Sequence, residues 1–472
     1  MALVMGVADY TTVPKLANTL RDTVLIEQTL VELDFEVRRL GDAGLQEMRD
    51  ALARFAFDAE TADVALFYFA GHGVEVGGRN FLIPADSTAR DRQEVVRTSL
   101  TLDEVLAAVD RARQLRIVIL DSCRDDPFAT VEENAAGSVK VITGVASRTG
   151  LAKPSPERGT LVAFAAEAGE VALDGAGDNS PFALSLAENM TTSDLEIGLM
   201  FRRVRDSVLR MTGNRQEPHT YGSLPGNPYF LAGRSQEANV LSDDARRQAW
   251  ARVAPDQLRQ IEALAGEGDT RALKGLAYMR LNPEEKDHDP AEGAKLLEQA
   301  ADRGDPEAMF ELGRLFEKGI GVAQDVPRAL ELFGKAADLG FADAINDLGF
   351  LHFQGGEGVL RDQRKALDHF ARAAELRHPE AMFNYAALID DGLVADKGPL
   401  DAARFLYEAL RSGNEDVLTQ LSDSPTMFKE QTRAELQRLL AEVAMYDGAI
   451  DGKFGPATRR GLRQAYGLSD ED

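Results

Sequence analysis

Residues 115–124, LRIVILDSCR, contain the only cysteine of the 472-residue chain, Cys123. Residues 117–120 are continuously apolar and mostly β-branched, which is typical of a parallel strand buried on both faces. In open α/β sheets, ligands bind beyond the carboxyl ends of the strands, and Cys123 stands at such an end. We therefore predict a buried strand that presents a reactive thiol where it ends.

A second apolar run, VALFYF at residues 64–69, is followed by AGHG, which contains His72. The thiolate is the nucleophilic form of cysteine, and a free thiol with a pKa of about 8.5 is little ionised near neutral pH, so a neighbouring base is needed. A lone cysteine is more often a small buried hydrophobe, and a lone histidine is more often structural. Their joint placement at two strand ends favours a catalytic dyad of His72 and Cys123.

The first half of the chain alternates predicted strands with helical segments, which indicates a mostly parallel sheet covered on both faces. The predicted strands are residues 2–7, 35–40, 64–69, 117–120 and 160–165. Residues 125–159 are rich in Gly, Ser, Pro and charge, so we predict a long exposed loop there. A peptidase specific for basic residues could cut itself in this loop, where the candidate sites are Lys140, Arg148, Lys153 and Arg158.

The motifs LFYFAGHG, ILDSC and FAAEAGEVALDG followed by NSPF, taken in this order, resemble the caspase-like fold of bacterial metacaspases and orthocaspases. The resemblance covers residues 1–232 and implies an α/β caspase-like sandwich with cysteine endopeptidase activity. By this resemblance, His72 protonates the leaving amine, and the backbone N–H groups of Gly73 and Cys123 stabilise the oxyanion.

The same resemblance suggests which peptide bond is cut. Caspases carry an arginine for an acidic substrate residue at the position of Asp174, and metacaspases place pocket acids at the positions of Asp9 and Asp121. Three carboxylates would pair with arginine or lysine, so cleavage after a basic residue is expected. The alternative is that Asp9 caps a turn and Asp174 belongs to an Asp-Gly turn.

Many metacaspases use calcium, and the aspartates available for it here are Asp86, Asp91, Asp125 and Asp126. They do not match a complete site, so calcium activation stays possible but no metal or other cofactor is predicted.

Four alanines in the second half mark an internal repeat: Ala272, Ala308, Ala344 and Ala381 are spaced 36, 36 and 37 residues apart. A period in the mid-thirties indicates stacked helical hairpins, and the segments resemble Sel-like repeats, which are related to tetratricopeptide repeats. We place this solenoid at residues 259–425, after a linker at 233–258. It is expected to bind a protein partner, and the alternative is a spacer.

Residues 426–472 are predicted as a small helical domain. The sequence DGKFGPAT at residues 451–458 resembles a loop of peptidoglycan-binding modules, although Ala465-Tyr466-Gly467 stands where that family has an aromatic residue followed by Gln. Peptidoglycan is therefore a possible ligand.

The formal net charge of -25 argues against nucleic acid or an anionic membrane as a partner. The sequence has no apolar run long enough for a transmembrane helix and no signal peptide at Met1, so we expect the cytoplasm, or the periplasm if the true start lies upstream. The chain is predicted to be a cysteine endopeptidase that cleaves after Arg or Lys and recruits partners through its repeats. The alternative is a catalytically silent caspase-like scaffold or signalling adaptor.

Overall fold

The computed structural model describes residues 1–123, 131–133, 139–141, 159–166, 172–173, 177–222, 224, 228–232, 250, 253, 255–355 and 358–468, with Cys123 described by its backbone. The chain divides into two compact units. The first comprises residues 1–245 and 253–257, and the second comprises residues 246–252 and 258–472. The division falls within the predicted linker.

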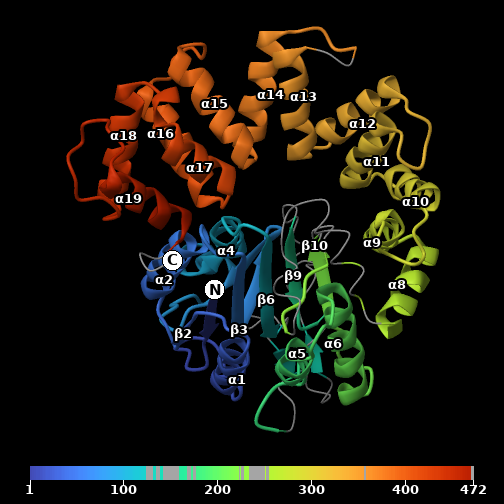
Figure 1. Ribbon diagram of the computed structural model, residues 1–472. Helices are drawn as coiled ribbons and strands as arrows, with labels where there is room; N and C mark the ends of the chain where they lie inside the picture. Colours follow the sequence, from blue (N-terminus) through green and yellow to red (C-terminus); the bar gives the residue numbers. More distant parts are fainter. Residues whose placement is uncertain are drawn as a thin grey trace. The chain divides into compact units, whose positions relative to one another are not determined.

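The first unit is built on a sheet whose main path runs β10-β9-β6-β3-β1-β2 (Figure 1). The strands of this path are β1 (Ala2–Gly6), β2 (Val37–Gly41), β3 (Val64–Val76), β6 (Leu115–Cys123), β9 (Thr160–Phe164) and β10 (His219–Gly222). All neighbours on the path pair in parallel except β10, which is antiparallel to β9. The predicted mostly parallel sheet is confirmed.

Strand β3 is longer than the predicted apolar run because its distal part pairs with β4 (Arg79–Leu82), which in turn pairs with β5 (Leu100–Thr101). Gly77 and Gly78 make the turn between β3 and β4 with φ of 61° and 82°, a conformation that glycine adopts without strain. Residues 125–159, predicted as a loop, contain a short antiparallel pair of strands, β7 (Val131–Glu133) and β8 (Val139–Val141).

Helices cover both faces of the sheet. They are α1 (Thr19–Glu32), α2 (Leu45–Ala59), α3 (Arg92–Thr98), α4 (Leu102–Val109), α5 (Pro181–Met190) and α6 (Ile197–Thr212). Helices α2 and α4 share an apolar core with one set of strand residues, including Phe67 and Val118. Helix α1 packs on α5, and α5 on α6. Because side chains alternate along a strand, Asp121 of β6 faces the opposite side from Val118.

The second unit is a series of helices that Figure 1 shows following one another along an arc. They are α8 (Pro255–Glu267), α9 (Thr270–Leu281), α10 (Pro290–Asp302), α11 (Pro306–Lys318), α12 (Val326–Asp338), α13 (Ala342–Gln354), α14 (Gln363–Glu375), α15 (Pro379–Asp391), α16 (Pro399–Arg411) and α17 (Glu415–Asp423). No helix among the described residues is long and apolar enough to cross a membrane.

Small residues let the paired helices of a repeat approach closely. Ala308 and Ala344 are fully buried, and a Cβ on Gly313 would lie 2.7 Å from the Phe333 ring of the partner helix. Gly349 meets Phe370 in the same way in the next repeat, where a Cβ would lie 2.9 Å from the ring. The alanine period detected in the sequence therefore corresponds to helix packing.

The C-terminal helices α18 (Glu430–Glu442) and α19 (Pro456–Tyr466), which follow the short 3-10 helix η2 (Pro425–Met427), share one apolar core with the last repeats. Buried Gln437 holds the loop between them: its Oε1 accepts hydrogen bonds from the N–H groups of Asp451 and Gly452, and its Nε2 donates to the carbonyl of Lys453. The loop that resembles peptidoglycan-binding modules is thus organised by the fold around Gln437.

A buried ion pair joins the first two repeats. Lys274 of α9 is 4% exposed, and its Nζ lies 3.0 Å from Asp305 Oδ2 and 2.6 Å from Glu307 Oε2. Although burial lowers the pKa of Lys274, the two carboxylates outweigh burial and raise it above its usual value. Trp250, the only tryptophan of the chain, is buried and packs against Gly275, which follows Lys274 in α9.

We predict that Lys274→Ala lowers the free energy of unfolding of the second unit by about 3 kcal/mol, because it leaves the carboxylates of Asp305 and Glu307 without their cation. Urea unfolding followed by Trp250 fluorescence measures this loss. The control is Lys335→Ala, which removes a 52% exposed lysine paired with Glu331 on α12 and is expected to cost less than about 0.5 kcal/mol. Equal losses in the two variants would contradict the prediction.

Candidate active site

The sheet brings the two predicted catalytic residues to adjacent positions of neighbouring strands. β3 and β6 pair in parallel from Val64 opposite Leu115 through to His72 opposite Cys123. Neighbouring strands lie about 4.8 Å apart, so the two backbones are within the reach of a side-chain contact at this point. Gly73, the predicted oxyanion donor, follows His72 in β3 at the place where β4 begins to pair.

His72 is held by the loop that follows β1. Its backbone N–H donates to the hydroxyl of Tyr10 over 2.7 Å, and the two rings pack with centroids 4.8 Å apart. Its Nε2 lies 2.7 Å from the carbonyl oxygen of Pro14. A carbonyl only accepts, so Nε2 carries a proton, and Nδ1 is the basic nitrogen of the neutral ring. The side chain is 7% exposed, so this arrangement is largely shielded from water.

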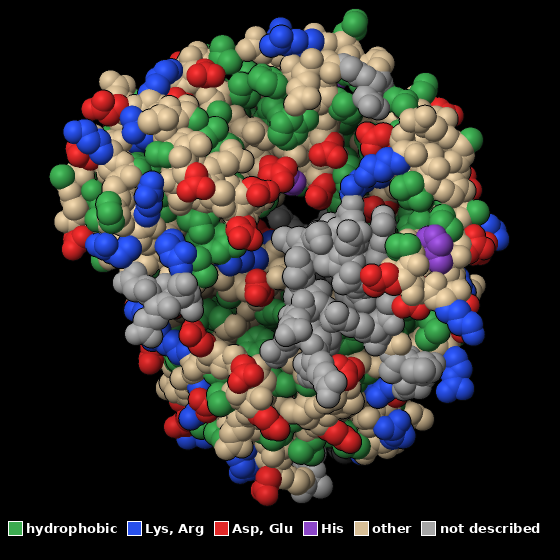
Figure 2. All heavy atoms as spheres, viewed as in Figure 1, with side chains coloured by type: hydrophobic (Ala, Val, Ile, Leu, Met, Phe, Trp, Pro, Cys, Tyr) green, Lys and Arg blue, Asp and Glu red, His purple; other side chains and the backbone are tan. Residues whose placement is uncertain are grey.

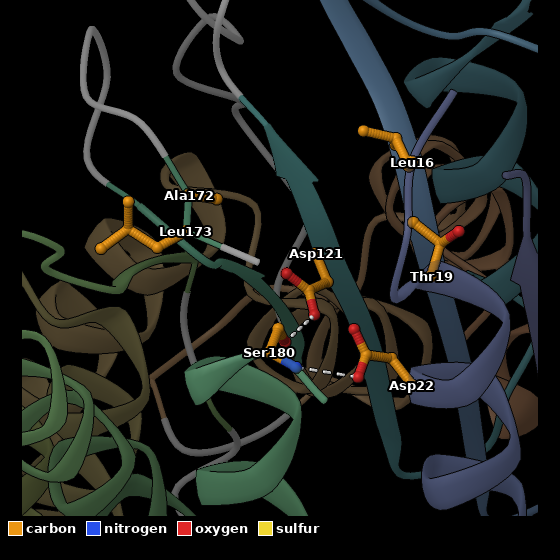
Figure 3. Close-up of a pocket in the computed structure, with 8 residues that line it drawn as sticks. Leu16, Thr19, Asp22, Asp121, Ala172, Leu173 and Ser180 are labelled. Carbon is orange, nitrogen blue, oxygen red and sulfur yellow. Dashed lines mark hydrogen bonds between the residues drawn. The ribbon is translucent and has the colours of Figure 1, made fainter. Parts of the chain in front are cut away.

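A small pocket near these strand ends contains two buried carboxylates, Asp121 of β6 and Asp22 of α1 (Figure 3). Asp121 Oδ2 accepts hydrogen bonds from the hydroxyls of Ser180 at 2.8 Å and Tyr68 at 3.0 Å. Asp22 Oδ1 accepts from the backbone N–H of Ser180 at 3.0 Å and from the side-chain amide of Asn179 at 2.8 Å. Burial, followed by the charges of Asp121 and Asp22, raises the pKa of Tyr68 well above its usual value.

The pocket has a volume of about 10 Å³, which is room for roughly one water molecule. Its lining residues are Leu16, Thr19, Asp22, Gly71, Asp121, Ala172, Leu173 and Ser180. Both carboxylates are almost fully buried, with exposed fractions of 2% for Asp22 and 9% for Asp121. The pocket therefore concentrates acceptor atoms in a small, nearly closed space.

The structure differs from the sequence prediction at Asp9. The Asp9 side chain is 64% exposed, forms an ion pair with Lys15, and does not line the pocket. The physical reason lies in the turn after β1, where the Asp42 carboxylate accepts the N–H groups of Ala8 and Asp9 and shapes the chain locally. Asp22 takes the expected place beside Asp121.

Asp22 was not predicted as a pocket residue, because it lies inside a helix rather than at a strand end. A signal was present: Asp22 falls at the spacing of the buried residues Thr19, Ile26 and Leu30, on the face of α1 that packs into the core. A carboxylate on such a face requires donors for its oxygens. Asp174, the third predicted pocket acid, lies outside the described residues, while Leu173 before it lines the pocket.

The aspartates considered for calcium have structural partners where the structure describes them. Asp91 caps α3 by accepting the N–H groups of Gln93 and Glu94, and Asp86 accepts the N–H of Leu45 at the start of α2. Asp125 and Asp126 lie outside the described residues. Within the described part of the chain, no three acidic, His or Cys side chains are grouped to hold a metal ion.

Comparison with known families agrees with this architecture. Residues 1–229 match the family model of the caspase domain. These residues therefore have a caspase-like α/β fold. Four consecutive segments after it, residues 270–305, 306–341, 342–378 and 379–414, match the Sel1 repeat. The predicted caspase-like sheet followed by a helical repeat solenoid is therefore confirmed.

Individual relatives cover only parts of the chain. The mucosa-associated lymphoid tissue lymphoma translocation protein 1 of Homo sapiens is 33% identical over 125 residues, which are 26% of this chain and 15% of that protein. Its Mus musculus homolog is 32% identical over the same length. The chain thus spans about 15% of the length of these curated relatives.

Two solved structures are also similar. A Sel1 repeat protein from Oxalobacter formigenes has 20% identity and a TM-score of 0.32, with 44% of this chain and 98% of that one covered. Caspase-1 from Spodoptera frugiperda has 15% identity and a TM-score of 0.36, with 50% of this chain and 90% of that one covered.

We predict that Gly71→Ala disturbs the support of His72, because a Cβ at this position would lie 2.6 Å from the Tyr10 hydroxyl and 2.7 Å from the Phe69 ring. Overpacking of this kind costs about 1–3 kcal/mol. Hydrogen exchange measured by mass spectrometry should show faster exchange in peptides that cover β3. The control is Gly177→Ala, where a Cβ meets no atom within 4 Å; equal exchange in both variants would contradict the prediction.

Proposed function

We propose that the caspase-like domain is a cysteine endopeptidase that hydrolyses peptide bonds after arginine or lysine. The observation that supports this most directly is the register of β3 and β6, which sets His72 opposite Cys123 at the carboxyl end of the sheet. The contact of His72 Nε2 with Pro14 adds a second reason, because it leaves Nδ1 as the proton acceptor.

The proposed reaction uses these groups in sequence. His72 Nδ1 takes the proton of the Cys123 thiol, and the thiolate attacks the scissile carbonyl to form a tetrahedral intermediate. The backbone N–H groups of Gly73 and Cys123 donate to its oxyanion. His72 then protonates the leaving amine, which leaves a thioester that water hydrolyses with His72 as the base. Tyr10 and Pro14 keep the imidazole in position throughout.

Basic specificity is supported by the two buried carboxylates, Asp22 and Asp121. Arginine carries five N–H donors and no acceptor, so its guanidinium suits a pocket of oxygen acceptors. The donors that now occupy these oxygens belong to Ser180, Asn179 and Tyr68. A substrate side chain would replace part of this set. Asp174 remains a candidate third acid.

The small volume of the pocket favours a second candidate function, that of a catalytically silent scaffold. A cavity of about 10 Å³ cannot hold an arginine side chain without movement of a lining residue. A catalytically silent scaffold that acts through its repeats would need no open pocket. The two functions differ in whether any peptide bond is cut.

The decisive experiment incubates the wild-type chain and Cys123→Ala with fluorogenic peptides that end in Arg, Lys or Asp, with and without calcium. We expect release of the fluorophore from the Arg and Lys peptides by the wild type only. Activity that persists in Cys123→Ala would refute the dyad, and cleavage of the Asp peptide alone would refute basic specificity. No cleavage of any peptide by the wild type would favour the scaffold.

The pocket acids are tested separately. Asp22→Asn and Asp121→Asn keep the side-chain volume but remove the charge, so kcat/KM for the Arg peptide should fall by about 10-fold or more, the loss that follows from about 1.4 kcal/mol of binding energy. The control is Asp103→Asn, which alters a 71% exposed carboxylate. Unchanged kcat/KM in both pocket variants, with circular dichroism equal to wild type, would remove these residues from the specificity site.

A further inference from the structure

The first helices of the third and fourth repeats carry a group of polar residues that the proposed peptidase activity does not use. α13 places Asp343, Asn346 and Asp347 at positions i, i+3 and i+4, which share one helix face. Glu380, at the equivalent position to Asp343 in the next repeat, lies on α15 37 residues later. We call these four residues the α13/α15 cluster. Figure 2 shows acidic side chains gathered around a histidine in the region of these helices.

Asn346 is the buried member of the α13/α15 cluster. It is 1% exposed, and its Nδ2 donates a long hydrogen bond of 3.5 Å to Glu380 Oε2. Its Oδ1 is buried and has no hydrogen-bond partner within the described part of the chain. A buried acceptor without a donor is costly, and a donor that reached this atom would remove that cost.

Asp347 adds a second acceptor without a direct partner. Among the described residues, no hydrogen bond or ion pair joins its carboxylate to another side chain. Burial and then the charge of Asp343 raise the pKa of Asp347 to about 6, with Glu380 acting in the same direction, while the charges of Arg314 and His378 oppose the shift. The cations already present therefore do not compensate this carboxylate fully.

The junction between the first two repeats has a lysine that the α13/α15 cluster lacks. Lys274 lies 72 residues before Asn346, that is two repeat periods, and its ammonium contacts Glu307, the counterpart of Glu380. At the α13/α15 junction an asparagine stands in place of this lysine, so the chain supplies no ammonium there. The acidic side chain is retained, the lysine is not, and a cationic partner near it is the His378 imidazole, whose Nε2 lies 3.8 Å from Asp343 Oδ1.

We propose that the α13/α15 cluster binds an arginine side chain in an extended segment of a partner protein. The guanidinium would take the place that the Lys274 ammonium occupies at the first junction. Arginine fits better than a metal ion, because the described residues contain no group of three acidic, His or Cys side chains arranged to hold one. Its five N–H donors suit a set of oxygen acceptors such as the carboxylates of the cluster and the Asn346 carbonyl. This inference is independent of the peptidase proposal.

The binding test uses the full chain with Cys123→Ala, so that no peptide can be cut, and a fluorescein-labelled octapeptide, Gly-Ser-Arg-Gly-Arg-Ser-Gly-Ser. Fluorescence anisotropy should give saturable binding that is lost when citrulline replaces arginine. Asp347→Asn should weaken binding at least tenfold. The matched control is Asp338→Asn, which removes the same charge from an exposed position at the end of α12 and should leave binding unchanged.

Asn346→Lys provides a second and opposite test. It recreates the arrangement of Lys274, so the new ammonium should fill the site, raise the Tm of the repeat unit and abolish peptide binding. The proposal is overturned if Asn346→Lys leaves binding unchanged, if Asp338→Asn weakens binding as much as Asp347→Asn, or if no saturable binding occurs. Binding that is lost in Asp121→Asn but kept in Asp347→Asn would assign the peptide to the caspase-like domain and also overturn it.

Discussion

The pairing of β3 with β6 is the constraint on which the rest of the candidate active site depends. Nine consecutive residue pairs run from Val64–Leu115 to His72–Cys123, and the apolar part of both strands is almost fully buried. A slip of one residue would exchange the two faces of a strand and bring polar groups into the apolar layers. Burial therefore fixes the register, and the register brings the histidine and the cysteine together.

The loop after β1 turns this backbone arrangement into a defined side-chain geometry. Tyr10 and Pro14 both come from that loop and contact different parts of His72. The loop is itself anchored, since Asp42 accepts two of its N–H groups and the hydroxyls of Thr11 and Thr12 donate to the carbonyl of Ser87. A residue outside the proposed dyad, Pro14, thereby determines which nitrogen of His72 carries the proton.

The repeats show how one framework carries different surface chemistry. Alanine and glycine positions set how closely the helices approach, and they recur with the period of the repeat. Positions at the junctions between first helices differ within that framework, as Lys274 and Asn346 show. Lys274 makes one junction an internally satisfied ion pair, whereas another junction has Asn346 at the equivalent position, with its buried Oδ1 lacking a hydrogen-bond partner among the described residues. A stabilising contact and a candidate binding site thus occupy equivalent places.

Local patterns in the sequence were enough to predict the parallel sheet, the positions of His72 and Cys123 after the apolar runs of two strands, and the repeat period. Continuous apolar runs and recurring small residues reflect burial directly. The extension of β3 beyond the apolar run depended on pairing with β4, and the choice of Asp22 over Asp9 beside Asp121 depended on how α1 packs onto the sheet. Such choices belong to the tertiary structure, because the donors that make a buried carboxylate acceptable come from segments far away in the chain: Asp22 is held by residues 157 and 158 positions later.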